Sequence, residues 1–211
     1  MELNGYIDHT NLKQNATQAD IERLCDEAAK YHFATVAINS CWTAMAAKRL
    51  AGTGVGVTTC IGFPLGACST QAKAAEAAQA VADGTTEIDM VVNGGHLVAG
   101  DDQYVIDDIA AVVRAAQGHP VKVILECCLL DDEQIVRACE DAVAAGASFV
   151  KTQHRLLDGR RHGARRGAHA QDRRDRCKVK AAVASTPRRK RLPCERSRRL
   201  GCSAGIKIVE G

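Results

Sequence analysis

Residues 121–151 read VKVILECCLLDDEQIVRACEDAVAAGASFVK. The first part, up to Glu126, is a short apolar run rich in β-branched residues, which is typical of a buried strand. Residues 131–145 then space their apolar side chains as a helix does, and Gly146 stands where a glycine commonly ends a helix. A second apolar run, residues 148–151, follows at once. Strand, helix and strand in this order predict one βα unit of a parallel sheet.

The same alternation extends along the chain. Thr17 is predicted to cap the first helix, with Asp20 as its partner in a capping box. Further helices are predicted over residues 43–51, 70–82 and 103–116, and further strands over residues 7–10, 35–38, 55–61, 87–92, 178–182 and 200–203. Eight strands close a βα barrel, so the sequence predicts an α/β (β/α)8 TIM barrel that forms one domain over residues 1–211.

Composition excludes several classes of protein. A chain of 211 residues that is 46% hydrophobic can bury one sizeable core. Neither an apolar run long enough to cross a bilayer nor a leader pattern is present, so we expect a cytoplasmic protein that does not enter a membrane. The ten cysteines lack paired metal-site spacing and are expected to be reduced, with Cys25, Cys41, Cys60, Cys68 and Cys139 in the core and Cys127 and Cys128 on opposite faces of a strand. No nucleotide-binding glycine motif follows a strand, and Gly94-Gly95 is expected to be a plain turn.

Polar residues that end apolar strands are the candidates for chemistry, because the active sites of such barrels lie at the carboxyl ends of the strands. Lys151 and Lys180 stand on neighbouring predicted strands and would face one barrel mouth. Desolvation and a nearby cation both favour a neutral amine, which can attack a carbonyl. Asp89 supplies a carboxylate that can carry protons. Asp8 and Glu126 occupy similar positions on other strands.

Structural interpretations of these residues stay open. A lysine at a strand end is commonly a solvated or salt-bridged residue, because ion-pair networks also place charged groups there. An aspartate at a strand end is often the N-cap of the next helix.

Several segments together resemble the deoxyribose-phosphate aldolase family. The resemblance covers residues 4–151, 175–182 and 200–211, and the matching motifs are IDHTNLK at 7–13, IGFPLGA at 61–67, EIDMV at 87–91, KVILE at 122–126, FVKT at 149–152 and GCSAG at 201–205.

The resemblance implies reversible cleavage of 2-deoxy-D-ribose 5-phosphate to acetaldehyde and D-glyceraldehyde 3-phosphate without metal or organic cofactor. It assigns the Schiff base to Lys151 and the proton relay to Asp89. Lys180 matches the second lysine, which perturbs the amine of Lys151 and assists proton transfer. It also places five residues near the substrate, which are Asp8, Thr10, Thr152, Ser203 and Ala204. Ser203 falls in the phosphate-binding turn of the family. A small phosphosugar is the expected partner, and the family commonly forms homodimers.

Two segments, residues 153–174 and 183–199, depart from the family. Only four arginines precede Phe149, but fourteen follow it. Where the family has a glycine-rich segment such as STGFSTGGAT, which holds phosphate through backbone amides, residues 153–164 read QHRLLDGRRHGA. Codons can be chosen for these residues that spell the family segment when the first base is dropped, and residues 183–187 are likewise compatible with a shifted reading of GGIHT. We therefore hypothesise compensating frameshifts, through sequencing error or a real lesion, which resequencing of the gene would test.

Three functions stay open from the sequence. The chain is an aldolase of this family, a related Schiff-base or enolising barrel enzyme with another phosphorylated substrate, or a catalytically inactive barrel that serves as a basic interaction module. A nucleic-acid-binding role for the arginines is disfavoured because aromatic stacking residues are absent among them. High charge with low hydrophobicity predicts instead a solvated stretch.

We predict that the chain as written is weakly active or inactive as an aldolase. The phosphate loops after the sixth and seventh strands are altered. Loss of a covering helix would also expose apolar sheet surface, which costs about 25 cal/mol of stability for each Å² exposed. Retro-aldol turnover of purified protein on deoxyribose 5-phosphate checks this prediction, and turnover close to that of an intact family member would contradict it.

Overall fold

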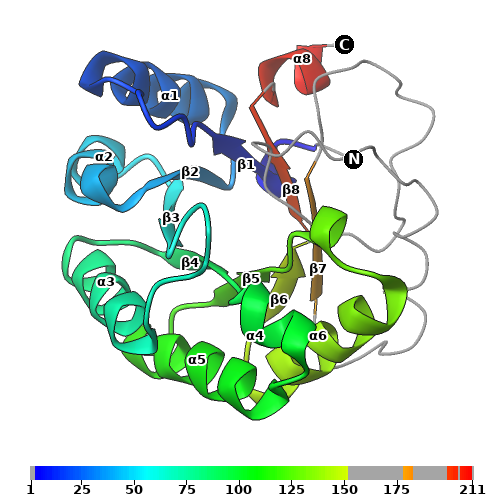
Figure 1. Ribbon diagram of the computed structural model, residues 1–211. Helices are drawn as coiled ribbons and strands as arrows, with labels where there is room; N and C mark the ends of the chain where they lie inside the picture. Colours follow the sequence, from blue (N-terminus) through cyan, green and yellow to red (C-terminus); the bar gives the residue numbers. More distant parts are fainter. Residues whose placement is uncertain (1–2, 152–177, 183–198, 204, 211) are drawn as a thin grey trace.

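The computed structural model is a closed barrel of eight parallel strands (Figure 1). The structure describes residues 3–151, 178–182, 199–203 and 205–210. Strands follow one another around the barrel in chain order, and β8 pairs with β1 to close it. The barrel predicted from the sequence is therefore confirmed. The sixth and seventh strands, which we expected to be perturbed, are formed and pair in parallel, whereas the helices expected after them lie outside the described residues.

The strands lie close to their predicted positions. They are β1 (Ile7–Thr10), β2 (Thr35–Asn39), β3 (Gly56–Ile61), β4 (Glu87–Val91), β5 (Val121–Ile124), β6 (Phe149–Lys151), β7 (Lys178–Ala182) and β8 (Arg199–Cys202). The main difference is that β5 ends two residues before Glu126, which adopts a left-handed conformation with φ of 52°.

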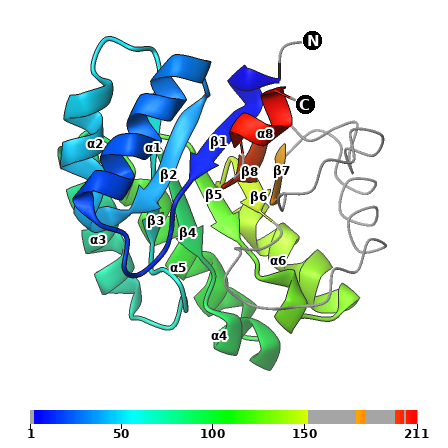
Figure 2. The ribbon, with the colours of Figure 1, turned by 90° about the horizontal axis from the view of Figure 1, so that it is seen from above.

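Helices surround the barrel on its outer side (Figure 2). They are α1 (Gln18–Tyr31), α2 (Thr43–Leu50), α3 (Thr70–Ala82), α4 (Gly94–Ala99), α5 (Asp102–Ala115), α6 (Asp132–Ala144) and α8 (Gly205–Glu210), with 3-10 turns η1 (Asn4–Tyr6), η2 (Ser40–Trp42) and η3 (Cys127–Leu129). The capping box predicted for Thr17 and Asp20 is present at the start of α1. None of the helices in the described part of the chain is long and apolar enough to span a membrane.

Two apolar cores lie between the sheet and the helices. One joins the outer faces of β3 to β6 to the buried stripes of α3, α5 and α6, and includes Met90, Ile109 and Ile135. The other joins β1 to β3 and β8 to α1 and α2, and includes Ile21 and Val36. Because side chains alternate along a strand, the neighbours of these apolar residues point into the barrel.

Two local predictions are wrong. Gly94-Gly95 begins the short helix α4 instead of a plain turn, because the Asn93 side chain accepts a hydrogen bond from the His96 backbone N–H and caps the helix. Cys127 and Cys128 lie in η3 and not on a strand, since β5 has already ended.

The cysteines are divided between core and surface. Cys25 and Cys60 are buried, as predicted, whereas Cys139 is only half-buried. Cys41 and Cys68 are exposed, against the prediction, because they stand in η2 and in the loop before α3.

Asp141 provides a test of how the outer layer responds to pH. It is a buried residue of α6, and burial followed by repulsion from Asp102 raises the pKa of its carboxyl from 3.8 to about 6. Between those two values the folded state holds a proton that the unfolded state releases, so stability is lost as pH rises from about 4 to 6. We predict that Asp141→Asn raises the free energy of unfolding by about 1 to 2 kcal/mol at pH 7 and changes it little at pH 4.

Denaturant unfolding at the two pH values measures this difference. Glu140→Gln is the control, because it makes the same change of charge at an exposed neighbouring position. Equal effects of the two substitutions at pH 7 would contradict the assignment to Asp141.

Candidate functional site

The barrel interior is polar over most of its described circumference. Its inward-facing positions carry seven polar residues, which are Asp8, Thr35, Thr58, Glu87, Asp89, Lys122 and Lys151, and all are at most 8% exposed. The interiors of such barrels are usually filled by branched apolar side chains. Buried charges are costly unless they are paired, so this interior requires a network of partners.

Asp89 is the centre of that network. Its Oδ2 accepts a hydrogen bond of 2.8 Å from Lys151 Nζ, and its Oδ1 accepts one of 2.8 Å from Lys122 Nζ. Asp89 stands in the middle of β4 and not at its end, against the prediction, because β4 continues to Val91; it is in register with Lys122 on β5. Lys151 is the last residue of β6 and lies one inward-facing step nearer the carboxyl end of the barrel, level with Ile124. One carboxylate thus holds two lysines from two other strands.

Lys122 has a second partner. Its Nζ lies 2.6 Å from Glu87 Oε2 and 6.0 Å from the centre of the Phe149 ring. The side chain is fully buried, and two carboxylates inside the barrel pair with its charge. The sequence analysis missed Lys122 as a site residue because it considered only polar residues at strand ends. A lysine at the second position of the apolar run Val121–Ile124 was the available signal.

Hydroxyl groups extend the network to the opposite side of the barrel. Thr58 Oγ1 donates to Glu87 Oε2 over 3.4 Å, and it lies 2.9 Å from Thr35 Oγ1. Thr35 in turn donates to Asp8 Oδ1 over 2.8 Å. A continuous chain of polar contacts therefore runs from β1 to β6 inside the barrel.

The predicted second lysine, Lys180, is placed by its backbone. Lys180 on β7 pairs in register with Lys151 on β6, as the sequence analysis expected of neighbouring strands. Its side chain lies outside the described residues. Its role in perturbing the Lys151 amine therefore stays a prediction.

Three of the five predicted substrate contacts, Asp8, Thr10 and Ser203, lie among the described residues. Asp8 is fully buried, and Thr10 at the end of β1 is half-buried and donates its hydroxyl to the Asp8 carbonyl oxygen. Ser203 is exposed directly after β8. Thr152 and Ala204 lie outside the described residues. Contact of these residues with a substrate stays a prediction.

Glu126 follows β5 at the same end of the barrel. Its Oε1 accepts a hydrogen bond of 3.1 Å from the Cys128 thiol. Burial, aided by Glu126, raises the pKa of the Cys128 thiol to about 11, and burial raises the pKa of the Cys127 thiol to about 12. The nucleophile of a thiol is its thiolate, so neither cysteine suits nucleophilic chemistry at neutral pH.

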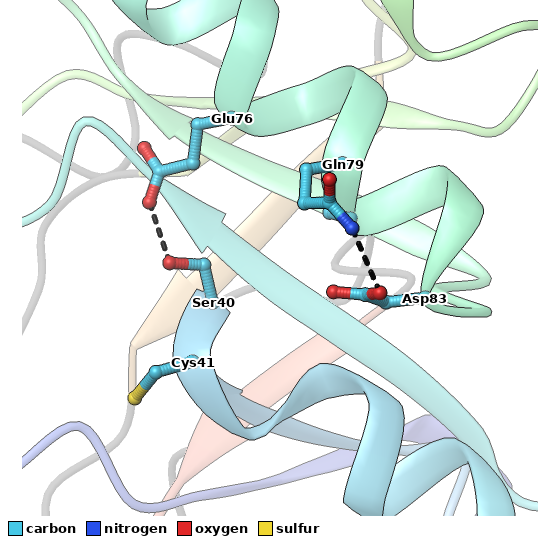
Figure 3. Close-up of a pocket in the computed structure, with 6 residues that line it drawn as sticks. Ser40, Cys41, Glu76, Gln79 and Asp83 are labelled. Carbon is cyan, nitrogen blue, oxygen red and sulfur yellow. Dashed lines mark hydrogen bonds between the residues drawn. The ribbon is translucent and has the colours of Figure 1, made fainter.

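The loop between β3 and α3 approaches the end of β4. Glu76 on α3 accepts a hydrogen bond from the Gly62 backbone N–H and another from Ser40 Oγ, which fixes the start of this loop. The outer groove beside Glu76, shown in Figure 3, is lined by Ser40, Cys41, Glu76, Gln79, Ala80 and Asp83. None of the predicted site residues lines it. Asp89 and Lys151 lie inside the barrel instead.

The described ranges contain no group of three or more His, Cys, Asp or Glu side chains that could hold a metal ion. The carboxylates of the interior are engaged by lysines and hydroxyl groups.

The chain is similar to known aldolases over its whole length. A family model described as DeoC/LacD family aldolase matches residues 4–206. A deoxyribose-phosphate aldolase of Finegoldia magna is 47% identical over 220 residues, covering 100% of this chain and 100% of the relative. Deoxyribose-phosphate aldolase 1 of Mesoplasma florum is 46% identical over 220 residues, covering 100% of this chain and 97% of the relative. A deoxyribose phosphate aldolase structure from Aeropyrum pernix superposes with a TM-score of 0.85 at 28% identity, covering 99% of this chain and 89% of that one.

Gly66 provides a test of how the loop is held over β4. Its φ is +67°, and a Cβ atom added there would lie 2.1 Å from the Val92 carbonyl oxygen. We predict that Gly66→Ala lowers the free energy of unfolding by about 2 to 4 kcal/mol, because both the backbone conformation and the space favour glycine. Gly94→Ala is the control, since nothing lies within 4 Å of its added Cβ. Thermal unfolding of both variants measures the difference, and a loss of less than about 0.5 kcal/mol for Gly66→Ala would contradict the prediction.

Proposed function

The chain belongs to the DeoC/LacD family of aldolases, and from this premise we propose that it cleaves 2-deoxy-D-ribose 5-phosphate reversibly to acetaldehyde and D-glyceraldehyde 3-phosphate. The relatives named deoxyribose-phosphate aldolase, which align over the full chain, support this substrate. The observation that carries the proposal is the hydrogen bond between Lys151 and Asp89 inside the barrel.

Lys151 is the lysine best suited to form the Schiff base. Its amine contacts one carboxylate, and 4% of the side chain is exposed at the carboxyl end of β6. Lys122 is fully buried and held between two carboxylates, so a substrate carbonyl would have to displace both. The different surroundings support Lys151 as nucleophile and leave Lys122 to another role.

The proposed reaction begins when the neutral Lys151 amine attacks the C1 aldehyde of the open-chain sugar. Loss of water from the carbinolamine gives an iminium ion, which can accept the electrons of the C2–C3 bond. Removal of the C3 hydroxyl proton then breaks that bond, releases glyceraldehyde 3-phosphate and leaves an enamine on Lys151. Protonation of the enamine carbon and hydrolysis release acetaldehyde. Asp89, within hydrogen-bond distance of the amine, is the proposed carrier of these protons.

Two further parts of the site are proposed from the family resemblance. Lys180, in register with Lys151, would favour the neutral amine by its positive charge. Thr152, Ser203 and Ala204 would contact the substrate, and Ser203 its phosphate. No cofactor is required by this chemistry. A homodimer and a cytoplasmic location stay predictions; the solved Aeropyrum pernix relative is described as a tetramer.

We predict that borohydride reduces an acetaldehyde adduct onto Lys151. Acetaldehyde carries no phosphate, so its capture does not depend on the altered phosphate loops and should persist even where turnover of the phosphosugar is weak. Peptide mass spectrometry should find the added ethyl group on Lys151, and Lys151→Met should abolish it.

Lys48→Met serves as the control, because it removes an exposed lysine of α2 far along the chain from the site. Capture should be unchanged in this variant. An adduct that survives Lys151→Met at the parent level would contradict the assignment of the nucleophile.

A further inference from the structure

Lys122 and Glu87 form a unit that the reaction as proposed does not use. The Lys122 ammonium lies 2.6 Å from Glu87 and 2.8 Å from Asp89, and the three groups are almost completely enclosed. Replacement of such a buried network by apolar side chains is often neutral or stabilising. Its presence in a barrel whose apolar cores lie outside the sheet therefore points to a part in the chemistry.

We infer that Lys122 is a positioning residue for Asp89, and that Glu87 offsets the charge of Lys122. This inference rests on the proposed function. By holding Oδ1, Lys122 fixes the plane of the Asp89 carboxylate, so that Oδ2 points at the Lys151 nitrogen. Without that anchor the carboxylate could rotate away once Lys151 becomes an imine.

Glu87 is needed because a proton carrier must also accept a proton. Two cations beside Asp89 would keep it ionised and make it a weak base. Glu87 pairs with one of these cations, so the Glu87–Lys122 pair adds little net charge. The charged side chains that the structure places at Asp89 are Lys122 and Lys151, with Glu87 behind Lys122, while Lys180 is placed only by its backbone.

The hydroxyl chain supports the placement of Glu87. Thr58 donates to the same Glu87 oxygen that contacts Lys122, and its Oγ1 lies 2.9 Å from Thr35 Oγ1. Glu87 therefore has partners from β3 and β5, which fix its carboxylate toward the lysine. In this scheme Glu87 offsets the charge of Lys122, and Lys122 in turn positions Asp89.

Deuterium exchange into the methyl group of acetaldehyde tests this inference. Imine formation on Lys151, loss of a methyl proton to give the enamine, and return of deuterium from heavy water require proton transfer by Asp89 but no phosphate. Proton NMR gives the exchange rate as a function of pH, and borohydride capture gives the fraction of Lys151 able to form the imine.

The variants are expected to move the acidic limb of the pH profile in opposite directions. Glu87→Gln leaves the charge of Lys122 without its partner, so exchange at neutral pH should fall about 10-fold and the limb should move to lower pH. Lys122→Met removes the cation, so the limb should move to higher pH and the rate should fall about 10-fold or more because the anchor is lost. The double variant removes a neutral pair, so its limb should lie near that of the parent while its rate stays low.

The control is Lys73→Met, which breaks a buried ion pair of the same kind outside the barrel. Lys73 and Asp108 are fully buried with 2.5 Å between Nζ and Oδ2. Lys73→Met should lower thermal stability without moving the acidic limb. If Lys122→Met does not fold, Glu87→Gln and the double variant decide the question.

A folded Glu87→Gln variant whose acidic limb does not move, or a folded double variant that exchanges at the parent rate, would overturn the inference while capture at Lys151 left the proposed function intact. Absence of both capture and exchange in the parent would instead overturn the proposed function, and this inference with it.

Discussion

The Asp89 carboxylate, held between two lysines, is the interaction on which the interior of this barrel depends. A single buried charge would destabilise the fold, and here four charges, two of each sign, lie within hydrogen-bond or ion-pair distance of one another. Three parallel strands supply them, and the register of β4, β5 and β6 sets their separation. The chemistry and the strand pairing are therefore parts of one arrangement.

The outer layer of helices supplies the stability that a charged interior does not. Apolar side chains of alternate strand positions pack against α1, α2, α3, α5 and α6, so most of the hydrophobic stabilisation is obtained outside the barrel. The inward positions are then available for carboxylates, hydroxyl groups and amines. The loop from Gly62 to Ser69, which Glu76 holds at its start, packs closely against the end of β4 at Val91 and Val92.

The sequence predicted much of this arrangement, but not its pairings. Alternating apolar runs and capping residues such as Thr17 located every described strand and most helices, because local periodicity and hydrogen bonding determine them. Asp89 and Lys151 were found as charged residues on apolar strands. Lys122 was missed because it lies inside an apolar run and not at a predicted strand end, and its pairing with Asp89 follows from the register of β4 against β5. The helix at Gly94 was missed because a single side-chain cap at Asn93 decided it.

The central claim is that Asp89 keeps one oxygen on Lys122 while the other serves the reacting nitrogen of Lys151. A crystal structure of the protein after borohydride reduction of its acetaldehyde adduct tests this directly. The account predicts an ethyl group on Lys151 Nζ, with Asp89 Oδ2 in hydrogen-bond contact with that nitrogen and Oδ1 still bonded to Lys122. An ethyl group on another lysine, or an Asp89 carboxylate turned away from Lys122, would contradict it.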